Sequence, residues 1–231
     1  MNILELSEQE IVRRNSLNRL REMGIDAYPA EEFVVDAWSE EVKANFSDDE
    51  AEPRQVRMAG RVMSRRIMGK ASFMELQDSK GRIQVYVNRD ELCPDEDKTL
   101  YNEVFKKLLD IGDFVGVTGF VFRTQTGEIS IHAKSLKLLS KSLKPLPIVK
   151  QKDGVTYDAF DDPELRYRQR YVDLIVNDGV KDTFLKRATI VKTLRSVLDE
   201  AGYTEVETPT LQAIAGGASA RPFITHFNAL N

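Results

Sequence analysis

The sequence predicts a mixed α and β chain around a five-stranded OB-fold barrel, with a helix before the barrel and a second domain after it. Hydrophobic residues alternate with a period of two in five short segments between residues 55 and 133, as in half-buried strands. A helical pattern separates the third segment from the fourth, which is the element order of an OB-fold. A segment with two prolines at 141–154 then precedes a long amphipathic helix, so we expect a domain boundary there.

The first predicted element is a helix that begins after Ser7. The letters SEQE at 7–10 form a Ser-x-x-Glu capping box, and apolar residues follow at helical spacing. Gly24 predicts the end of this helix after about four turns. We expect four arginines on its exposed side: Arg13, Arg14, Arg19 and Arg21. Residues 1–54 are thus expected to hold this helix and an acidic connector with some helix.

The barrel domain is expected over residues 55–145. Its strands are predicted at about 56–67, 71–77, 82–87, 114–122 and 129–133. The letters DSKG form the turn between the second and third strands, and TQTGE forms the last turn. A helix at about 97–109 lies between strands three and four. Gly60, Gly116 and Gly119 fall inside strands, where they suit the bends that barrel closure needs.

The remainder of the chain is predicted to be a hinge, residues 146–179, followed by part of a second domain, residues 180–231. A helix at about 180–201 carries an apolar stripe and ends at Gly202. The letters YTEVETPTL then predict a short strand that Pro209 breaks.

Composition limits the kind of protein. A net charge of −4 and a pI near 5.4 argue against a chain that is basic all over, so any nucleic-acid site must be a local patch. The single cysteine, Cys93, excludes an intrachain disulfide and a cysteine cluster for zinc. No secretory signal is visible, and no stretch has the apolar length that spans a bilayer. We therefore expect a cytoplasmic protein.

One outer face of the predicted barrel combines polar groups with rings. Side chains alternate across a strand, so Phe73 points outward with Glu75 while Met74 points inward. The same alternation places further residues on this face: Gln84, Tyr86, Glu128 and His132. In the first strand both residues 62 and 63 are apolar, so periodicity does not place residues 65 and 66, of which we expect one to point outward.

This face belongs to a basic segment. Nine basic and three acidic residues lie between residues 54 and 90, a local balance of +6 in an acidic chain. Basic groups bind phosphates through counterion release, and an exposed ring can stack on an unpaired base. Binding of single-stranded RNA or DNA is the hypothesis that follows. Its alternatives are that Phe73 plugs the barrel mouth, that Gln84 is merely solvated and that the charges only solubilise the chain.

Four segments together resemble the N-terminal part of the class II lysyl-tRNA synthetase family. They are GRVMSRRIMGKASFMELQDSKGRIQVYV, LRYRQRYVDLI, GYTEVETPTL and GGASARPFITHFNAL, in the family's order and spacing. The aspartate and asparagine enzymes share the barrel, but GKASF and ARPFITH are more similar to the lysine enzyme. The resemblance covers almost the whole chain and implies that the part after the hinge begins the antiparallel α/β catalytic domain of class II synthetases.

The resemblance implies that the barrel binds the anticodon loop of lysine tRNA. Phe73 matches the ring that stacks on the central uridine, and Arg66 and Gln84 match side chains that hydrogen-bond this base. Glu128 matches the residue that approaches a neighbouring anticodon base. The assignment of Arg66 rests on the resemblance alone.

Two further residues take expected roles from the family. The segment 180–211 resembles motif 1, which ends in Pro209 and packs against its twofold mate in a homodimer. Gly217 matches a glycine whose carbonyl meets the α-ammonium of the substrate lysine. A plain core helix and a flexible glycine turn remain alternatives for these segments.

The family's enzymes attach L-lysine to its tRNA with ATP and Mg²⁺. The arginines that hold ATP, in motifs 2 and 3, and the carboxylates for Mg²⁺ match nothing before the chain stops at NALN, so no catalytic or metal-binding residue is assigned. We therefore expect this chain to bind tRNA without aminoacylating it. The rival hypotheses are a non-enzymatic OB module that binds single-stranded nucleic acid generally, and a chain that folds only as far as its barrel.

Overall fold

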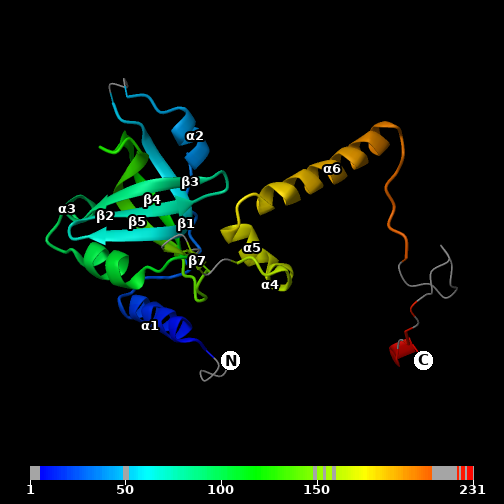
Figure 1. Cartoon of the computed structure of the whole chain (residues 1–231), viewed down its shortest axis with the longest axis horizontal. Coiled ribbons are helices and arrows are strands. Elements are labelled where there is room, and N and C mark those ends of the chain that lie inside the picture. Colours follow the sequence, from blue (N-terminus) through cyan, green and yellow to red (C-terminus); the bar gives the residue numbers. More distant parts are fainter. Residues whose placement is uncertain are drawn as a thin grey trace. The chain divides into compact units, whose positions relative to one another are not determined.

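The computed structural model describes residues 6–48, 52–147, 150–152, 155–157, 160–209, 223, 225–226 and 228–230. The chain divides into two compact units, Met1–Asp162 and Pro163–Asn231. The first unit contains the barrel and the helix α1, and the second contains the helices α4, α5 and α6 (Figure 1).

The first helix, α1 (Glu8–Glu22), begins with the predicted capping box. The backbone N–H of Glu10 donates to Ser7 Oγ over 3.3 Å, and the backbone N–H of Ser7 donates to Glu10 Oε2 over 3.1 Å. The prediction that Arg13 is exposed was wrong, because its side chain lies against the barrel and the residue is only 5% exposed. Its guanidinium donates to the carbonyls of Ile111 and Ser142, so this arginine holds α1 to the segments that precede β4 and follow β5.

Five strands form a closed barrel in the order β1-β2-β3-β5-β4, which confirms the predicted fold class. The strands are β1 (Gln55–Met68), β2 (Ala71–Gln77), β3 (Arg82–Asn88), β4 (Phe114–Arg123) and β5 (Ile129–Ser140). β3 pairs with β5 in parallel, and the other neighbouring strands are antiparallel. β5 runs seven residues beyond its predicted end at residue 133, since Leu136 and Leu138 continue the buried alternation.

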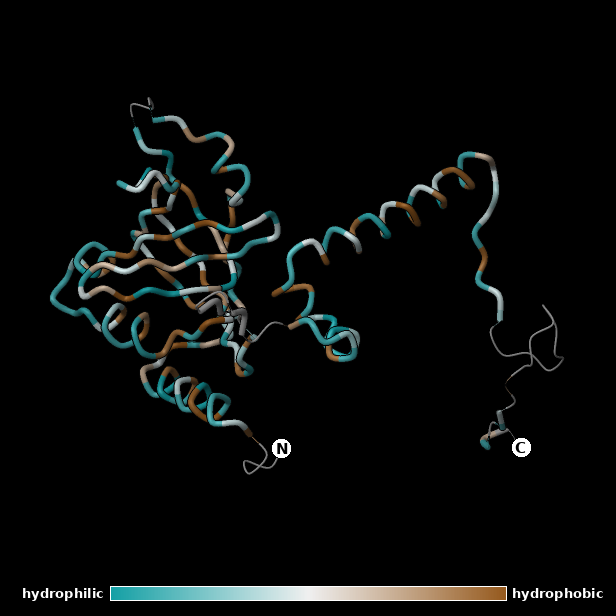
Figure 2. Tube along the Cα trace, in the orientation of Figure 1, coloured by the Kyte–Doolittle hydropathy of each residue, from teal (hydrophilic) through white to brown (hydrophobic). Residues whose placement is uncertain are grey.

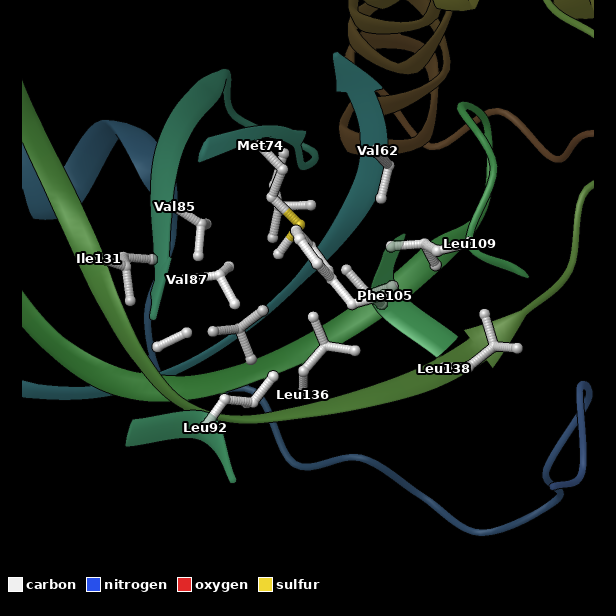
Figure 3. Packing of buried hydrophobic residues seen from close by; sticks show 14 of the residues in the cluster. Val62, Met74, Val85, Val87, Leu92, Phe105, Leu109, Ile131, Leu136 and Leu138 are labelled. Atoms are coloured by element: carbon white, nitrogen blue, oxygen red, sulfur yellow. The ribbon is translucent and has the colours of Figure 1, made fainter. Parts of the chain in front are cut away.

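The barrel interior follows from the alternation seen in the sequence. Every second residue of β2 and β3 is buried, which gives both strands the same regular pattern. Figure 3 shows the inward side chains of several strands meeting Phe105 and Leu109. Because successive side chains of a strand alternate between its two faces, side chains of the opposite parity lie on the outer face.

A β-bulge explains why the first strand resisted assignment. The pairing of β1 with β2 shifts between Val62 and Ser64, so two successive residues, Val62 and Met63, are both buried. The extra residue reverses the phase of the strand beyond it. Arg66 consequently lies opposite Phe73 on the outer face.

Short helices fill the connections of the first unit. They are α2 (Ser39–Ala44), α3 (Arg89–Leu92) and η2 (Leu100–Leu108). η2 has π-helical winding, and the N–H of Leu109 donates to the carbonyl of Val104 five residues earlier. Tyr101 of this helix lies fully in the core, where its hydroxyl is 2.8 Å from Ser72 Oγ.

A buried cluster of charged groups lies at the end of β5. The ammonium of Lys141, whose side chain is 0% exposed, lies 2.7 Å from Asp113 Oδ2 and 2.5 Å from Asp110 Oδ2. The backbone N–H groups of Asp110 and Ser142 also donate to the Asp113 carboxylate. A buried pair of this kind is tolerated because its remaining hydrogen-bonding capacity is used.

The segment that was expected to be a hinge contains regular structure. A short hairpin joins β6 (Lys150–Lys152) to β7 (Val155–Tyr157), and two helices follow, α4 (Pro163–Arg168) and α5 (Arg170–Val176). Buried Asp173 accepts from Arg166 Nε over 2.8 Å and from Asn177 over 2.7 Å, which fixes the turn between the two helices.

The long helix α6 (Val180–Glu200) matches its prediction, and Gly202 follows it with φ +85°. Its apolar stripe is visible as brown patches along the helix in Figure 2. The strand expected in YTEVETPTL was wrong for residues 203–209, which have no strand structure among the described residues. A strand needs a hydrogen-bonded neighbour, and the described part of this unit supplies none. No helix among the described residues has the length and apolar character needed to cross a membrane.

Candidate nucleic-acid interface

A concavity of about 520 Å³ opens on the outer face of the barrel. It contains all four residues expected to contact an anticodon: Arg66, Phe73, Gln84 and Glu128. Its other lining residues are Lys43, Ser64, Arg65, Met74, Glu75, Arg82 and Ile83. The fold therefore gathers the predicted residues from β1, β2, β3 and the turn before β5 at one site.

Arg66 and Phe73 are a cross-strand pair in this concavity. They face each other directly between β1 and β2, and Arg66 Cζ lies 5.6 Å from the centre of the Phe73 ring. The residue Arg66 is exposed, and its guanidinium has no hydrogen-bond or ion-pair partner among the described residues. Five N–H donors are therefore available beside a half-buried aromatic ring.

Arg65 serves a different contact. Its guanidinium donates to the carbonyl of Phe105 in η2 and lies 5.8 Å from the Phe105 ring. Burial lowers the pKa of Arg65, which nevertheless stays protonated at neutral pH. This side chain holds η2 to the barrel while its neighbour faces the concavity.

Gln84 lies on the strand beside Phe73 and has a fixed orientation. Ser130 Oγ donates to Gln84 Oε1 over 2.9 Å, which leaves the amide nitrogen without a partner among the described residues. Ser130 lies opposite Gln84 in the sheet and is fully buried. The carboxylate of Glu75, opposite Gln84, lies 3.5 Å from an Arg82 nitrogen.

Glu128 closes one side of the concavity together with a residue that the sequence reasoning missed. Lys43 Nζ, from α2, lies 3.2 Å from Glu128 Oε1. Lys43 belongs to the acidic connector, and no local pattern marks it as part of a site. Only the tertiary fold brings α2 to the rim of this surface.

Beside the concavity, aromatic rings continue across the sheet. Phe73 pairs with Tyr86, Tyr86 with His132, and His132 with Phe120, so one residue of each of four neighbouring strands joins a single row. The ring centres are 5.2, 4.9 and 4.7 Å apart in that order. We call these four residues the aromatic row. Phe122 lies in the next row, 6.0 Å from Tyr86 and 5.5 Å from His132.

The imidazole of His132, one ring of the aromatic row, lies beside a carboxylate. Its Nε2 lies 3.0 Å from Glu91 Oε2, and its side chain is 14% exposed. Burial lowers the pKa of His132, although the Glu91 carboxylate opposes this shift. A hydrogen bond from Lys134 lowers the pKa of Glu91, so this carboxyl stays ionised.

The arrangement suits binding more than chemistry. A ring for stacking, two groups of hydrogen-bond donors and surrounding arginines suit the binding of unpaired bases. Among the described residues, no group of three or more His, Cys, Asp and Glu side chains could hold a metal ion. No step of a reaction is assigned to these residues.

The two remaining predicted residues belong to the second unit. Pro209 is exposed at the end of the described segment that follows α6. Gly217, expected to meet the substrate lysine, lies outside the described residues.

Two family models match the chain. Residues 56–139 match the OB-fold nucleic acid binding domain, which coincides with the barrel and its concavity. Residues 162–231 match the tRNA synthetases of class II (D, K and N), which coincides with the second unit.

Curated relatives are similar over the whole chain. A lysine–tRNA ligase of Porphyromonas gingivalis (strain ATCC BAA-308 / W83) is 64% identical over 232 residues, covering 100% of this chain and 40% of the relative. The lysine–tRNA ligase of Azobacteroides pseudotrichonymphae genomovar. CFP2 is 65% identical over 227 residues, covering 98% of this chain and 45% of the relative. The lysine–tRNA ligase of Christiangramia forsetii is 57% identical over 228 residues, covering 98% of this chain and 39% of the relative. The chain thus spans about two fifths of the length of these relatives.

Proposed function

Because the chain belongs to the lysine–tRNA ligase family, we propose that its barrel binds the anticodon loop of lysine tRNA. The observation that carries this proposal is the concavity itself, which collects Arg66, Phe73, Gln84 and Glu128 on one face. In the proposed complex the central uridine enters the concavity and its neighbours lie along the barrel surface.

Each of three side chains has a task in this proposal. The ring of Phe73 stacks on the uracil ring, which every base would allow. The guanidinium of Arg66 and the amide nitrogen of Gln84 donate to the uracil carbonyl oxygens, and this selects the base. Ser130 supports the selection because its bond to Gln84 Oε1 directs the amide nitrogen outward.

Glu128 and Lys43 form the proposed contact for a neighbouring anticodon base. Both side chains are about half exposed, so their ion pair contributes little to stability and can be replaced by contacts with RNA. The carboxylate would accept from a base, while the ammonium would approach a phosphate.

For the whole protein we propose ATP-dependent attachment of L-lysine to lysine tRNA, with Mg²⁺, in the cytoplasm. Gly217 is the proposed contact for the substrate lysine. The apolar stripe of α6 and the segment ending at Pro209 are the proposed homodimer contact, since several of its large apolar side chains are exposed in the second unit: Leu185, Ile190, Leu194, Val197 and Leu198.

A titration with two RNAs tests the binding proposal. The 231-residue chain is titrated at one fixed salt concentration with the lysine anticodon stem–loop and with a stem–loop of the same stem and a scrambled loop. Tighter binding of the lysine loop, by ~1–3 kcal/mol for one read and stacked base, is expected. Equal binding of both RNAs would instead support a general single-strand binder.

A further inference from the structure

We propose that Tyr86 and Phe122 form a second base-stacking site, for the unpaired base next in the RNA strand to the one bound at Phe73. This inference rests on the proposed function, because it extends the same RNA along the same barrel face. Neither ring lines the concavity, so the second site adjoins the first without sharing these residues.

The spacing of the rings carries the inference. From Phe73 to Tyr86 the centres are 5.2 Å apart, and from Tyr86 to Phe122 they are 6.0 Å apart. Tyr86 lies directly opposite Phe73 in the sheet, so no other residue separates the two surfaces. A strand that places one base on Phe73 therefore brings the following base over these rings without stretching its backbone.

The rings are not needed for the barrel core. Inward residues of the same strands, such as Val85 and Ile131, are 0% exposed and already fill the interior. Tyr86 and Phe122 instead lie half-buried on the outer face, where exposure of apolar surface to water costs free energy. Two outward rings beside a basic concavity therefore point to a ligand with flat aromatic faces.

The second site is also held rigidly. The His132 ring stacks on Phe120 at 4.7 Å with an interplanar angle of 29°, and it meets Tyr86 edge-on at 84°. This inner support fixes the outer rings before RNA arrives, so little side-chain freedom is lost on binding. Stacking accepts any base, so the second site adds affinity without selecting a sequence.

A basic group at the far end of the aromatic row, Lys134, suits the RNA backbone. Lys134 Nζ lies 5.5 Å from the Phe120 ring centre and pairs with Glu91. The Lys134 side chain is 47% exposed, so a phosphate can compete with Glu91 for this ammonium. A nucleic-acid strand fits this surface better than an apolar protein segment, which would leave the charges buried and unpaired.

The test measures dissociation constants of the 231-residue chain for three RNAs. These are the lysine anticodon stem–loop and two copies that lack the base on one or the other side of the central uridine. The variants are Phe122→Leu and Tyr86→Leu, and Phe114→Leu is the matched control because Phe114 lies on β4 away from the aromatic row. Thermal unfolding of each variant reports that the barrel remains folded.

We expect Phe122→Leu and Tyr86→Leu to weaken binding of the intact loop about 5- to 10-fold, and Phe114→Leu to change it less than about 2-fold. With one of the two base-lacking RNAs, wild type and both variants should bind equally. An equal loss on all three RNAs, or no loss for either folded variant, would overturn the second site.

A fourth RNA, with the central uridine replaced, separates this inference from the proposed function. If the wild-type chain discriminates against this RNA but both ring variants bind the intact loop as tightly as wild type does, only the second site fails. If it shows no discrimination while the ring variants still weaken binding, only the anticodon proposal fails. Absence of measurable binding by the wild-type chain would overturn both.

Discussion

Two adjacent arginines show how one residue of register decides a role. The bulge at Val62–Ser64 places Arg66 opposite Phe73, whereas Arg65 turns to the carbonyl of Phe105. The first is exposed at the concavity and the second holds a helix. Sequence periodicity could not separate them, because the two successive apolar residues at 62 and 63 leave the phase of the strand beyond them open.

Replacing Arg66 by lysine keeps the charge but removes the planar fork of donors. Arg66→Lys is expected to lower the preference for the lysine loop over a scrambled loop about 5- to 10-fold, with little change in binding of the scrambled loop. The matched control is Arg57→Lys, since Arg57 pairs with Asp36 outside the concavity. Fluorescence anisotropy with labelled stem–loops gives both values, and an unchanged preference would contradict the assigned role.

The lowered pKa of His132 predicts that the stability of the folded chain depends on pH. Burial lowers its pKa in the folded chain, so the unfolded chain binds a proton first as the pH falls below the ordinary histidine value of about 6.5. The stability that depends on neutral His132 is therefore present above this pH and is lost below it. The free energy of unfolding of wild type minus that of His132→Gln should decrease between pH 7.5 and pH 5.5, and chemical denaturation at both values measures it. A difference that stays constant would contradict the argument.

At the scale of elements, the closed barrel depends on places where backbones approach closely. A Cβ at Gly119 would lie 2.0 Å from the His132 carbonyl oxygen, at the register shift between Thr118 and Gly119. A Cβ at Gly116 would lie 2.7 Å from the Phe33 ring. These contacts explain why glycines interrupt a strand composed mainly of β-branched and aromatic residues.

Gly119→Ala should destabilise the chain by about 2 kcal/mol or more, because backbone must move to admit the methyl group. Gly81→Ala is the control, since its Cβ would meet only Ser39 Oγ at 3.2 Å, and we expect a change within about 1 kcal/mol. Urea denaturation of the three chains compares them. Equal stability of both variants would show that β4 adapts at little cost.

The buried Lys141 joins the end of β5 to the segment that follows α1 and to the segment before β4. Lys141→Met leaves the Asp113 carboxylate buried without its cation, so we expect a loss of about 3–5 kcal/mol in the free energy of unfolding. Lys137→Met is the matched control, because the Lys137–Glu31 pair is exposed and should contribute little to the free energy of unfolding. Adding Asp113→Asn to Lys141→Met should restore part of the loss, and no restoration would argue against a charge effect.

Most elements of the barrel could be predicted because each has a local signal. β2 and the start of β3 match their predicted ranges, and Ser7 and Glu10 fix the start of α1. The extension of β5, the π-winding of η2 and the burial of Arg13 depend on tertiary contacts, which local periodicity does not contain. The site shows the same division: the outward rings were predictable, but Lys43 was not.

At the scale of the whole molecule, an acidic chain carries a local basic surface. The net charge is −4, yet the concavity is lined by Lys43, Arg65, Arg66 and Arg82 against two carboxylates. Binding should therefore depend on the patch and weaken with salt, while the rest of the chain repels non-specific nucleic acid. The family match of the second unit places this surface in a protein whose relatives join lysine to tRNA.

The most direct test of the anticodon proposal compares lysine tRNA with the same tRNA carrying cytidine at the central anticodon position. Cytidine keeps the stacking surface but presents an amino donor where uridine presents an oxygen, so it would face the donors of Arg66 and Gln84. At one fixed salt concentration, a loss of ~1–3 kcal/mol is predicted for the wild-type chain, and Arg66→Lys should reduce this difference. Equal affinity of the wild-type chain for both tRNAs would contradict the account.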